Sequence, residues 1–314
     1  MGNAYELGED ILASFEANMK QLSSNTFIWP PIKATRESAG KWATIQNLKM
    51  IAGVYGSYVP QTIRLKPDDP IPEDWVLKRS HSECATHVVL PTQAKRYQTW
   101  DYLKANTASG AFWMAQEHVL SLEQIGEWRV FLVGGNIISI MHTHRRKDKG
   151  WTGGPVETFV TLEEIRWVLH LDIGNILIRF IVSELIENQD KKPLDLGNLR
   201  DKIVGPEAGV APIREKALAE FASFVRRVWR ELVIRETRSS GGKPSISLFC
   251  RMDIGLRIDP NGVEPPAYFV NEVERSLNTS LWLLFQDKTM GTLADTFAMV
   301  FRQWLQDSLN PYIF

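Results

Sequence analysis

This sequence of 314 residues has little cysteine, no long apolar run and no excess of charge of either sign. Its two cysteines, Cys84 and Cys250, are too few for a disulfide framework, and this usage is typical of a reducing compartment. No apolar run approaches the roughly 20 residues that a membrane-spanning helix needs, and the N-terminal segment carries acidic residues in place of an apolar signal region. We therefore expect a cytosolic protein without a membrane segment.

The charges nearly cancel, with 36 basic and 37 acidic residues. A balanced chain has no overall attraction to nucleic acid or to an anionic membrane, so we expect neither as a partner. Apolar residues make up 44% of the sequence, which is enough for burial to drive folding. Length and composition together predict a globular protein with one or two cores.

Periodicity divides the chain into helical and strand-like segments. Apolar residues at helical spacing predict helices over residues 8–22, 41–52, 162–171, 213–232 and 292–305. Strand patterns cover residues 75–78, 87–90, 112–119, 127–144, 245–258 and 268–276. Hairpin turns are expected at Gly134-Gly135 and at the sequence DPNG over 259–262. This order favours an α+β chain with antiparallel strands.

Charged residues gather in the last predicted hairpin. Arg251 and Asp253 share one face of its first strand, and Glu272 and Glu274 share one face of its second strand. If the turn pairs the two strands antiparallel, three carboxylates and one guanidinium converge near one end of a sheet. Carboxylates this close raise one another's pKa unless a cation neutralises them, and hard oxygen ligands suit Mg²⁺. The hairpin therefore predicts a magnesium site.

A simpler interpretation of these carboxylates stays open. Charged side chains at the end of an edge strand prevent pairing with other chains, and a Glu-x-Glu pattern at such an end is common. Arg251 and Asp253 on the partner strand shift the balance toward the metal site without deciding between the two interpretations.

Four segments in order carry a further signal: DWVLKRS, AQEHV, GEWRVFLVGGNIISIMHTHRR, and CRMDIG followed by FVNEVE. Together they resemble the nucleotide- and metal-binding motifs of the ATP-grasp enzymes, a family that includes D-alanine ligases, glutathione synthetases, ribosomal-protein glutamate ligases and tubulin tyrosine ligase. The resemblance covers about residues 41–275 and depends on the order of the motifs, because each one alone is weak.

The resemblance implies which residues bind ATP. Lys78 would contact the nucleotide phosphates, and Lys41 would be the second nucleotide-contacting lysine, with Lys49 as a competitor. Ser80 and Ser82, in the loop after Lys78, would hold phosphate. The adenine hinge would consist of Gln116, Glu117, His118 and Val119.

It also implies the groups around the reacting atoms. Glu127 would bind the ribose, and Arg129 would bind the phosphate or acyl-phosphate region. Arg251 would grip the acyl phosphate, since a planar guanidinium can bind two oxygens at once. The ligands for Mg²⁺ would be Asp253, Glu272 and Glu274.

The implied architecture is the α+β ATP-grasp fold, with two α+β subdomains whose antiparallel sheets clasp ATP between them. Residues 1–74 would be a helical and strand segment that replaces the usual N-terminal substrate domain of roughly a hundred residues. Residues 75–149 would form the small subdomain with the phosphate loop and hinge. Residues 150–314 would form the large subdomain with the metal-binding hairpin.

Two features depart from the family pattern. The last metal ligand is usually Asn, and here it is Glu274, so either the cation binds more strongly or Arg275 compensates the added charge. The loop after Lys78 lacks the usual glycines, so hydroxyl and backbone N–H groups would hold phosphate. These hydroxyls belong to Ser80, Ser82 and Thr86.

Three functions follow as alternatives. The first is an ATP- and Mg²⁺-dependent ligase that joins a small-molecule or peptide carboxylate to an amine through an acyl phosphate. The second is a kinase on the same fold, which the basic segment HTHRRKDK would suit because it could bind a polyanionic acceptor. The third is a nucleotide-binding pseudoenzyme. The sequence leaves the substrate and the formation of a homodimer open.

Overall fold

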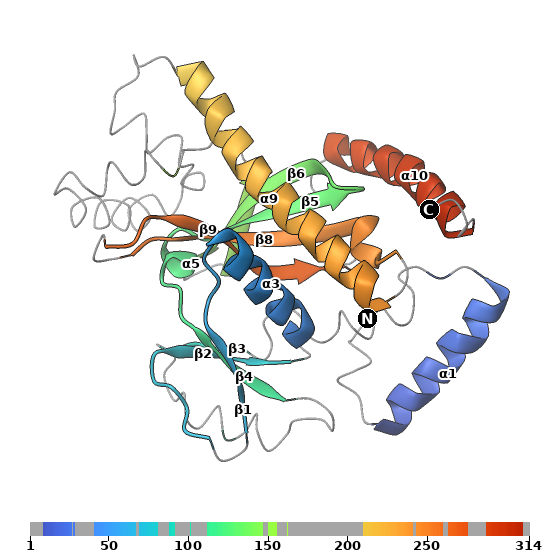
Figure 1. The fold of residues 1–314 in the computed structure, drawn as a ribbon, viewed down its shortest axis with the longest axis horizontal. Coiled ribbons are helices and arrows are strands. Elements are labelled where there is room, and N and C mark those ends of the chain that lie inside the picture. Colours follow the sequence, from blue (N-terminus) through green and yellow to red (C-terminus); the bar gives the residue numbers. More distant parts are fainter. Residues whose placement is uncertain are drawn as a thin grey trace. The chain divides into compact units, whose positions relative to one another are not determined.

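Antiparallel pairing builds two separate sheets in this chain (Figure 1). The computed structural model describes residues 9–26, 28, 41–66, 69–80, 88–91, 101, 112–146, 150–155, 162, 210–240, 243–259, 263–275 and 287–309. Backbone contacts divide the chain into a first unit, Met1–Met50 with Val59–His118, and a second unit, Ile51–Tyr58 with Val119–Phe314. Helix α3 (Lys41–Tyr55) contributes residues to both units.

The first unit contains a four-stranded sheet with the order β1-β4-β2-β3. Leu77 of β2 lies opposite Ala115 of β4 and Val89 of β3, and all three side chains are fully buried. Together with Leu65 and Trp113 they form one buried apolar cluster. The elements of this unit are α1 (Glu9–Asn25), β1 (Thr62–Leu65), β2 (Trp75–Arg79), β3 (Val88–Val89) and β4 (Trp113–Glu117).

The second unit contains a five-stranded sheet with the order β7-β6-β5-β8-β9. The turn between β5 and β6 consists of Gly134 and Gly135, whose φ angles of 57° and 80° favour glycine. A Cβ at Gly135 would also lie 2.5 Å from the ring of Trp229, so a larger residue would have to displace that ring. The strands are β5 (Glu127–Val133), β6 (Asn136–Arg146), β7 (Gly150–Pro155), β8 (Phe249–Arg257) and β9 (Ala267–Glu274).

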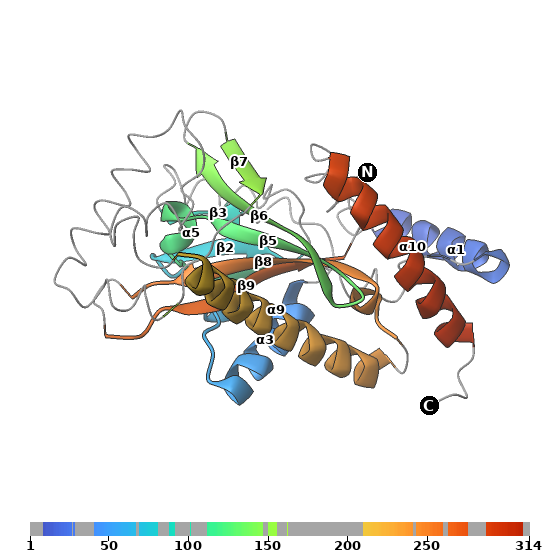
Figure 2. The same cartoon turned by 90° about the horizontal axis from the view of Figure 1, so that it is seen from above.

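Helix α9 (Val210–Ser240) covers one face of this sheet (Figures 1 and 2). Phe221 packs edge-on against Tyr268 of β9, with ring centroids 5.1 Å apart, and against Trp128 of β5 at 5.9 Å. Side chains alternate between the two faces of a strand. The neighbours of Trp128 in sequence, Glu127 and Arg129, therefore belong to the opposite face.

Among the described residues, three further elements belong to the second unit. Phe297 of α10 (Asp287–Leu309) packs against Phe249 at the start of β8, with ring centroids 6.3 Å apart. The indole of Trp304 donates a hydrogen bond of 2.9 Å to the hydroxyl of Ser247, in the short helix η2 (Ser245–Ser247). Helix α5 (Ser121–Gln124) precedes β5.

The fold class is confirmed, because the chain combines helices with two antiparallel sheets. Among the residues that the structure describes, no helix is both long and apolar enough to cross a membrane. The helices around 8–22, 41–52, 213–232 and 292–305 are present as α1, α3, α9 and α10. The helix predicted over 162–171 lies, except for Leu162, outside the described residues.

The division into units differs from the predicted boundaries at residues 74/75 and 149/150. Strand β1 pairs with β4, so it belongs to the first sheet and not to a separate N-terminal segment. The predicted boundary at 149/150 groups strands β5 and β6 with β2 to β4. In the structure, β5 pairs with both β6 and β8, so β5 and β6 belong to the second sheet. The contacts therefore divide the chain after His118 and not after residue 149.

Candidate active site

Three adjacent strands of the larger sheet bring the charged residues together. Arg129 of β5 lies opposite Asp253 of β8, which in turn lies opposite Glu272 of β9. Two residues further along the same pair of strands, Arg251 of β8 lies opposite Glu274 of β9. The antiparallel pairing expected for the last hairpin is thus confirmed, and β5 adds a second guanidinium on the same face.

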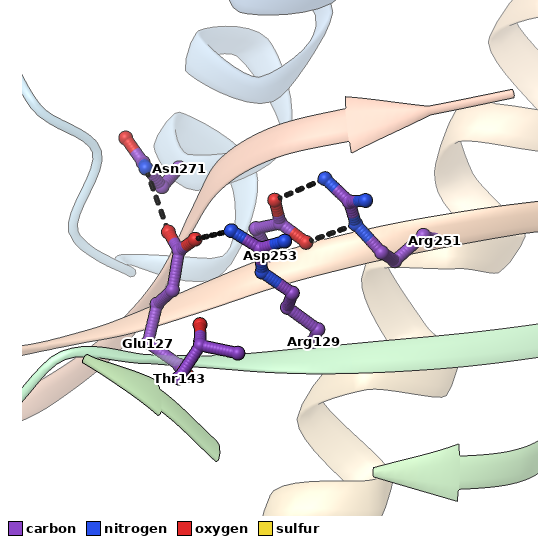
Figure 3. Close-up of polar contacts among 6 residues, drawn as sticks. All are labelled: Glu127, Arg129, Thr143, Arg251, Asp253 and Asn271. Atoms are coloured by element: carbon purple, nitrogen blue, oxygen red, sulfur yellow. Dashed lines mark hydrogen bonds and ion pairs between the residues drawn. The ribbon is translucent and has the colours of Figure 1, made fainter. Parts of the chain in front are cut away.

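Arg251 and Asp253 form a two-bond ion pair within one strand (Figure 3). The guanidinium Nε and Nη2 donate to the two carboxylate oxygens, Oδ1 and Oδ2, both at 2.7 Å. The two residues are buried, with 8% and 1% exposure. Burial acts to lower the pKa of Arg251, but the negative charge of Asp253 outweighs it and raises that pKa overall.

Glu127 is held from two directions (Figure 3). Its Oε1 accepts a hydrogen bond of 3.1 Å from Arg129 Nη2, and its Oε2 accepts one of 3.0 Å from Asn271 Nδ2. Burial, and then repulsion by Asp253, raises the pKa of Glu127 to about 7, while Arg129 and Asn271 act to lower it. This carboxyl group therefore changes charge near neutral pH.

A β-bulge brings Asn271 into this cluster. In β9, Glu272 pairs with Asp253, and Val270 pairs with the next residue of β8, Ile254, so the register skips Asn271. A bulge of this kind inserts one residue and redirects side chains locally. Asn271 was not predicted from the sequence, since strict alternation assigns it to the face opposite Glu272. Only its place directly before the Glu-x-Glu pattern could have drawn attention to it.

In the first unit, Lys78 and Gln116 lie on neighbouring strands and contact each other. Lys78 Nζ donates a hydrogen bond of 2.6 Å to Gln116 Oε1, and Gln116 Nε2 donates one of 3.0 Å to Thr62 Oγ1. The lysine expected at the phosphates thus lies beside the first residue of the expected adenine hinge. Both side chains are positioned by the pairing of β2 with β4.

Lys41 and Ser80 also lie together in the first unit. The backbone N–H of Lys41, the first residue of α3, donates to the carbonyl of Ser80 at 3.1 Å. The hydroxyl of Ser80 accepts a hydrogen bond of 3.1 Å from the backbone N–H of Phe112, so in this structure it joins β2 to the start of β4. Ser82, which was expected to help hold phosphate, lies outside the described residues.

The rest of the expected hinge spans the division between the units. Glu117 Oε2 accepts a hydrogen bond of 3.0 Å from the backbone N–H of Gln61, which ties the end of β4 to the residue before β1. His118 is the last residue of the first unit. The buried Val119 begins the segment Val119–Phe314, which belongs to the second unit. The chain therefore passes from one unit to the other within the expected hinge.

Comparison with solved structures identifies the fold. A D-cycloserine synthetase, DcsG, superposes with a TM-score of 0.53 at 14% sequence identity, covering 94% of this chain and 79% of that protein. The chain has the ATP-grasp fold. A second match is a D-alanine–D-alanine ligase from Bacillus anthracis complexed with ATP, with a TM-score of 0.46 and 12% identity, covering 99% of this chain and 77% of that one. A third is the ATP-grasp ligase PsnB with a minimal precursor, with a TM-score of 0.43 and 12% identity, covering 93% of this chain and 71% of that one. The sequence matches no family model and no curated protein.

Arg275, which was considered as compensation for the charge of Glu274, has another partner. Its Nη1 and Nη2 donate to the two carboxylate oxygens of Glu236 on α9 at 2.6 and 2.5 Å, and both residues are buried. Arg275 therefore pairs with a carboxylate of α9.

The carboxylates fit a divalent cation by chemistry, but their present arrangement does not form a site. Within the described part of the chain, no three His, Cys, Asp or Glu side chains are arranged to hold a metal ion. Asp253, the central residue of the expected ligand set, has both oxygens bound to Arg251. After burial, its charge is the next cause that raises the pKa of Glu127, and this is the kind of repulsion that a bound cation would relieve.

Proposed function

We propose that the protein is an ATP-dependent ligase that activates a substrate carboxylate and joins it to an amine. The observation that carries this proposal is the burial of two ion pairs, Glu127 with Arg129 and Arg251 with Asp253, on one face of the larger sheet. Burying charged groups is costly, and ionisable groups with shifted pKa values gather at functional sites. The ATP-grasp fold supplies the context in which such a face would handle phosphate.

The residues of the first unit would bind the nucleotide. Lys78 and Lys41 would hold the phosphates, with the hydroxyls of Ser80 and Ser82 and backbone N–H groups of the loop after Ser80 adding donors. A lysine that makes a charge-assisted hydrogen bond to phosphate contributes about 1.5–3 kcal/mol. The adenine base would be held by the hinge, whose members are Gln116, Glu117, His118 and Val119.

The residues of the second unit would act on the reacting groups. Arg129, held in orientation by Glu127, would bind phosphate oxygens, while Glu127 would also accept hydrogen bonds from the ribose. Arg251 would grip the acyl phosphate with its planar fork. The residues that would hold Mg²⁺ are Asp253, Glu272 and Glu274, and bound Mg²⁺ would neutralise charge on the phosphate oxygens.

The reaction balances in two steps. A carboxylate oxygen of the substrate attacks the γ-phosphorus of ATP, the bond to the β-phosphate oxygen breaks, and ADP leaves. The amine nitrogen then attacks the carbonyl carbon of the acyl phosphate, phosphate leaves, and the nitrogen releases a proton. Phosphoryl transfer offers a protein little covalent work, so the side chains contribute by positioning and by charge stabilisation.

The decisive experiment measures ADP release with pools of carboxylic acids and amines, each alone and both together. A ligase forms its joined product only when both partners are present, whereas release with a hydroxyl acceptor and no amine would show a kinase. The substrate pools should include small-molecule and peptide carboxylates. If ATP with Mg²⁺ gives no thermal stabilisation, the protein is not an ATP-binding enzyme, because a ligand at about a hundred times its Kd adds about 2.7 kcal/mol.

A lysine substitution tests the nucleotide site directly. Lys78→Met should weaken ATP binding about tenfold to a hundredfold, since it removes one charge-assisted hydrogen bond. Calorimetric titration with ATP measures this effect. Lys66→Met, at an exposed lysine of the same unit, is the matched control and should leave the affinity unchanged. Equal affinities in all three proteins would exclude Lys78 from the site.

A further inference from the structure

Three side chains of the smaller sheet form a chain of hydrogen bonds across three strands. The ammonium group of Lys78 on β2 donates to Gln116 Oε1 at 2.6 Å, and Gln116 Nε2 donates to Thr62 Oγ1 on β1 at 3.0 Å. The hydroxyl of Thr62 donates in turn to the carbonyl oxygen of Pro60 at 3.1 Å. Strand β4, which carries Gln116, lies between β1 and β2, so this side chain can reach both neighbouring strands.

The two ends of this chain fix the direction of its hydrogen bonds. An ammonium group has donors and no acceptor, and a backbone carbonyl only accepts. Gln116 therefore turns its oxygen toward Lys78 and its NH₂ group toward Thr62, whose own proton goes to Pro60. An inverted amide would place its NH₂ group against the ammonium group. The chain thus selects one orientation for the side chain of Gln116, which is only 6% exposed.

Strand pairing places the three side chains on one face of the sheet. Thr62 lies directly opposite Gln116, and Lys78 is a diagonal neighbour, because Gln116 lies opposite Val76, two residues before Lys78. Diagonal neighbours on one face are within reach of each other when a side chain is long. The buried apolar cluster that includes Leu77 belongs to the other face. A substitution in the hydrogen-bond chain therefore leaves the packing of that cluster in place.

Resting on the proposed ligase function, we propose that Thr62 and Gln116 are positioning residues for Lys78. Their hydrogen bonds hold the ammonium group in one place, so the lysine loses less side-chain entropy when it binds a phosphate group of the nucleotide. An ammonium group has three N–H donors, so its bond to Gln116 does not use up its capacity for phosphate. The side chain of Gln116 thus serves the phosphate contact and does not recognise the adenine base.

Calorimetric titration of the full chain with ATP tests this role. Thr62→Val keeps the shape of the side chain and removes the hydroxyl, and it should weaken ATP binding about threefold to tenfold, as expected for one lost hydrogen bond. Thr62→Ser keeps the hydroxyl and should retain most of the affinity. Thr237→Val makes the same chemical change at an exposed residue of α9 and should leave the affinity unchanged.

Two comparisons show whether Thr62 acts through Lys78. In a Lys78→Met background, Thr62→Val should weaken ATP binding no further, because the positioned group is absent. Adenosine has no phosphate group, so the original protein and Thr62→Val should bind it equally. A loss of affinity for adenosine as large as that for ATP would assign the chain to base recognition and overturn the proposal. A full further loss in the Lys78→Met background would overturn it as well.

The same titrations separate this inference from the proposed function. If the original protein does not bind ATP, the proposed function fails and the inference fails with it. If Lys78→Met weakens ATP binding but Thr62→Val does not, the nucleotide site stands and only the positioning role is refuted. Circular dichroism and thermal unfolding show whether each variant folds. If Thr62→Val does not fold, Thr62→Ala removes the same hydroxyl with a smaller side chain and replaces it in every comparison.

Discussion

Replacing Glu127 with glutamine should remove much of the pH dependence of folding stability in the weakly acidic range. Burial, and then the charge of Asp253, raises the pKa of Glu127 from 4.5 to about 7. The folded state therefore binds more protons than the unfolded state between these values, so the free energy of unfolding falls as pH rises through this window. The stabilisation is fully present below pH 4.5 and is lost above about pH 7.

The magnitude follows from the size of the shift. Each pKa unit corresponds to about 1.36 kcal/mol, so the loss across the window is on the order of 3 kcal/mol at most. Glutamine keeps an oxygen that accepts from Arg129, and the amide of Asn271 can turn to accept from the new NH₂ group. Glu127→Gln should therefore fold, and above pH 7 it should be more stable than the original protein by about 1–3 kcal/mol.

Urea unfolding at about pH 5 and about pH 8 measures this difference. Glu264→Gln makes the same chemical change at an exposed carboxylate, whose side chain is 58% accessible, and should leave the pH dependence as it is in the original protein. If Glu127→Gln keeps the full pH dependence, another group carries the titration, and the argument from the burial of Glu127 is refuted.

Further substitutions test the packing of the second unit. Gly135→Ala should destabilise it by about 2–4 kcal/mol, because the φ of 80° disfavours a side chain and the new Cβ would lie 2.5 Å from the ring of Trp229. Gly53→Ala, in α3 with open space around it, should instead stabilise by about 0.5–1 kcal/mol, as denaturant unfolding can show. Glu236→Gln should lower the free energy of unfolding by about 3–5 kcal/mol, because it leaves Arg275 buried without its charge partner. Replacing both Glu236 and Arg275 by apolar residues should restore most of this stability. A double variant as unstable as the single one would contradict the reasoning.

The last hairpin shows how much of the site the sequence could predict. Alternation along the two strands was enough to place Asp253 and Glu272 in one cluster. The turn expected at residues 259–262 does not give their register, because the strands pair from Arg257 and Ala267 across a longer connection. The bulge at Asn271 was not predictable in this way. It brings Asn271 to Glu127, a residue of β5 that is distant in sequence.

The division into units was predicted less well, for a related reason. Periodicity identifies a strand but not its partners, and β5 could pair with β4 before it or with β8 far along the chain. In the structure it pairs with β8, which carries Arg129 to Asp253 and completes the site. Lys78 and Gln116, by contrast, lie on the adjacent strands β2 and β4, and their order in the sequence already suggested a common unit.

Two buried ion pairs on opposite faces of the same hairpin differ in what they join. Arg275 with Glu236 connects β9 to α9, so its cost is offset by the docking of a helix onto the sheet. Arg251 with Asp253 connects two residues of one strand, which the backbone already holds in place, so the pair docks no element onto another. Burying charges without such a gain lowers stability, so the second pair is best explained by chemistry on that face. Replacing both Arg251 and Asp253 by apolar residues should therefore stabilise the fold while abolishing cation binding.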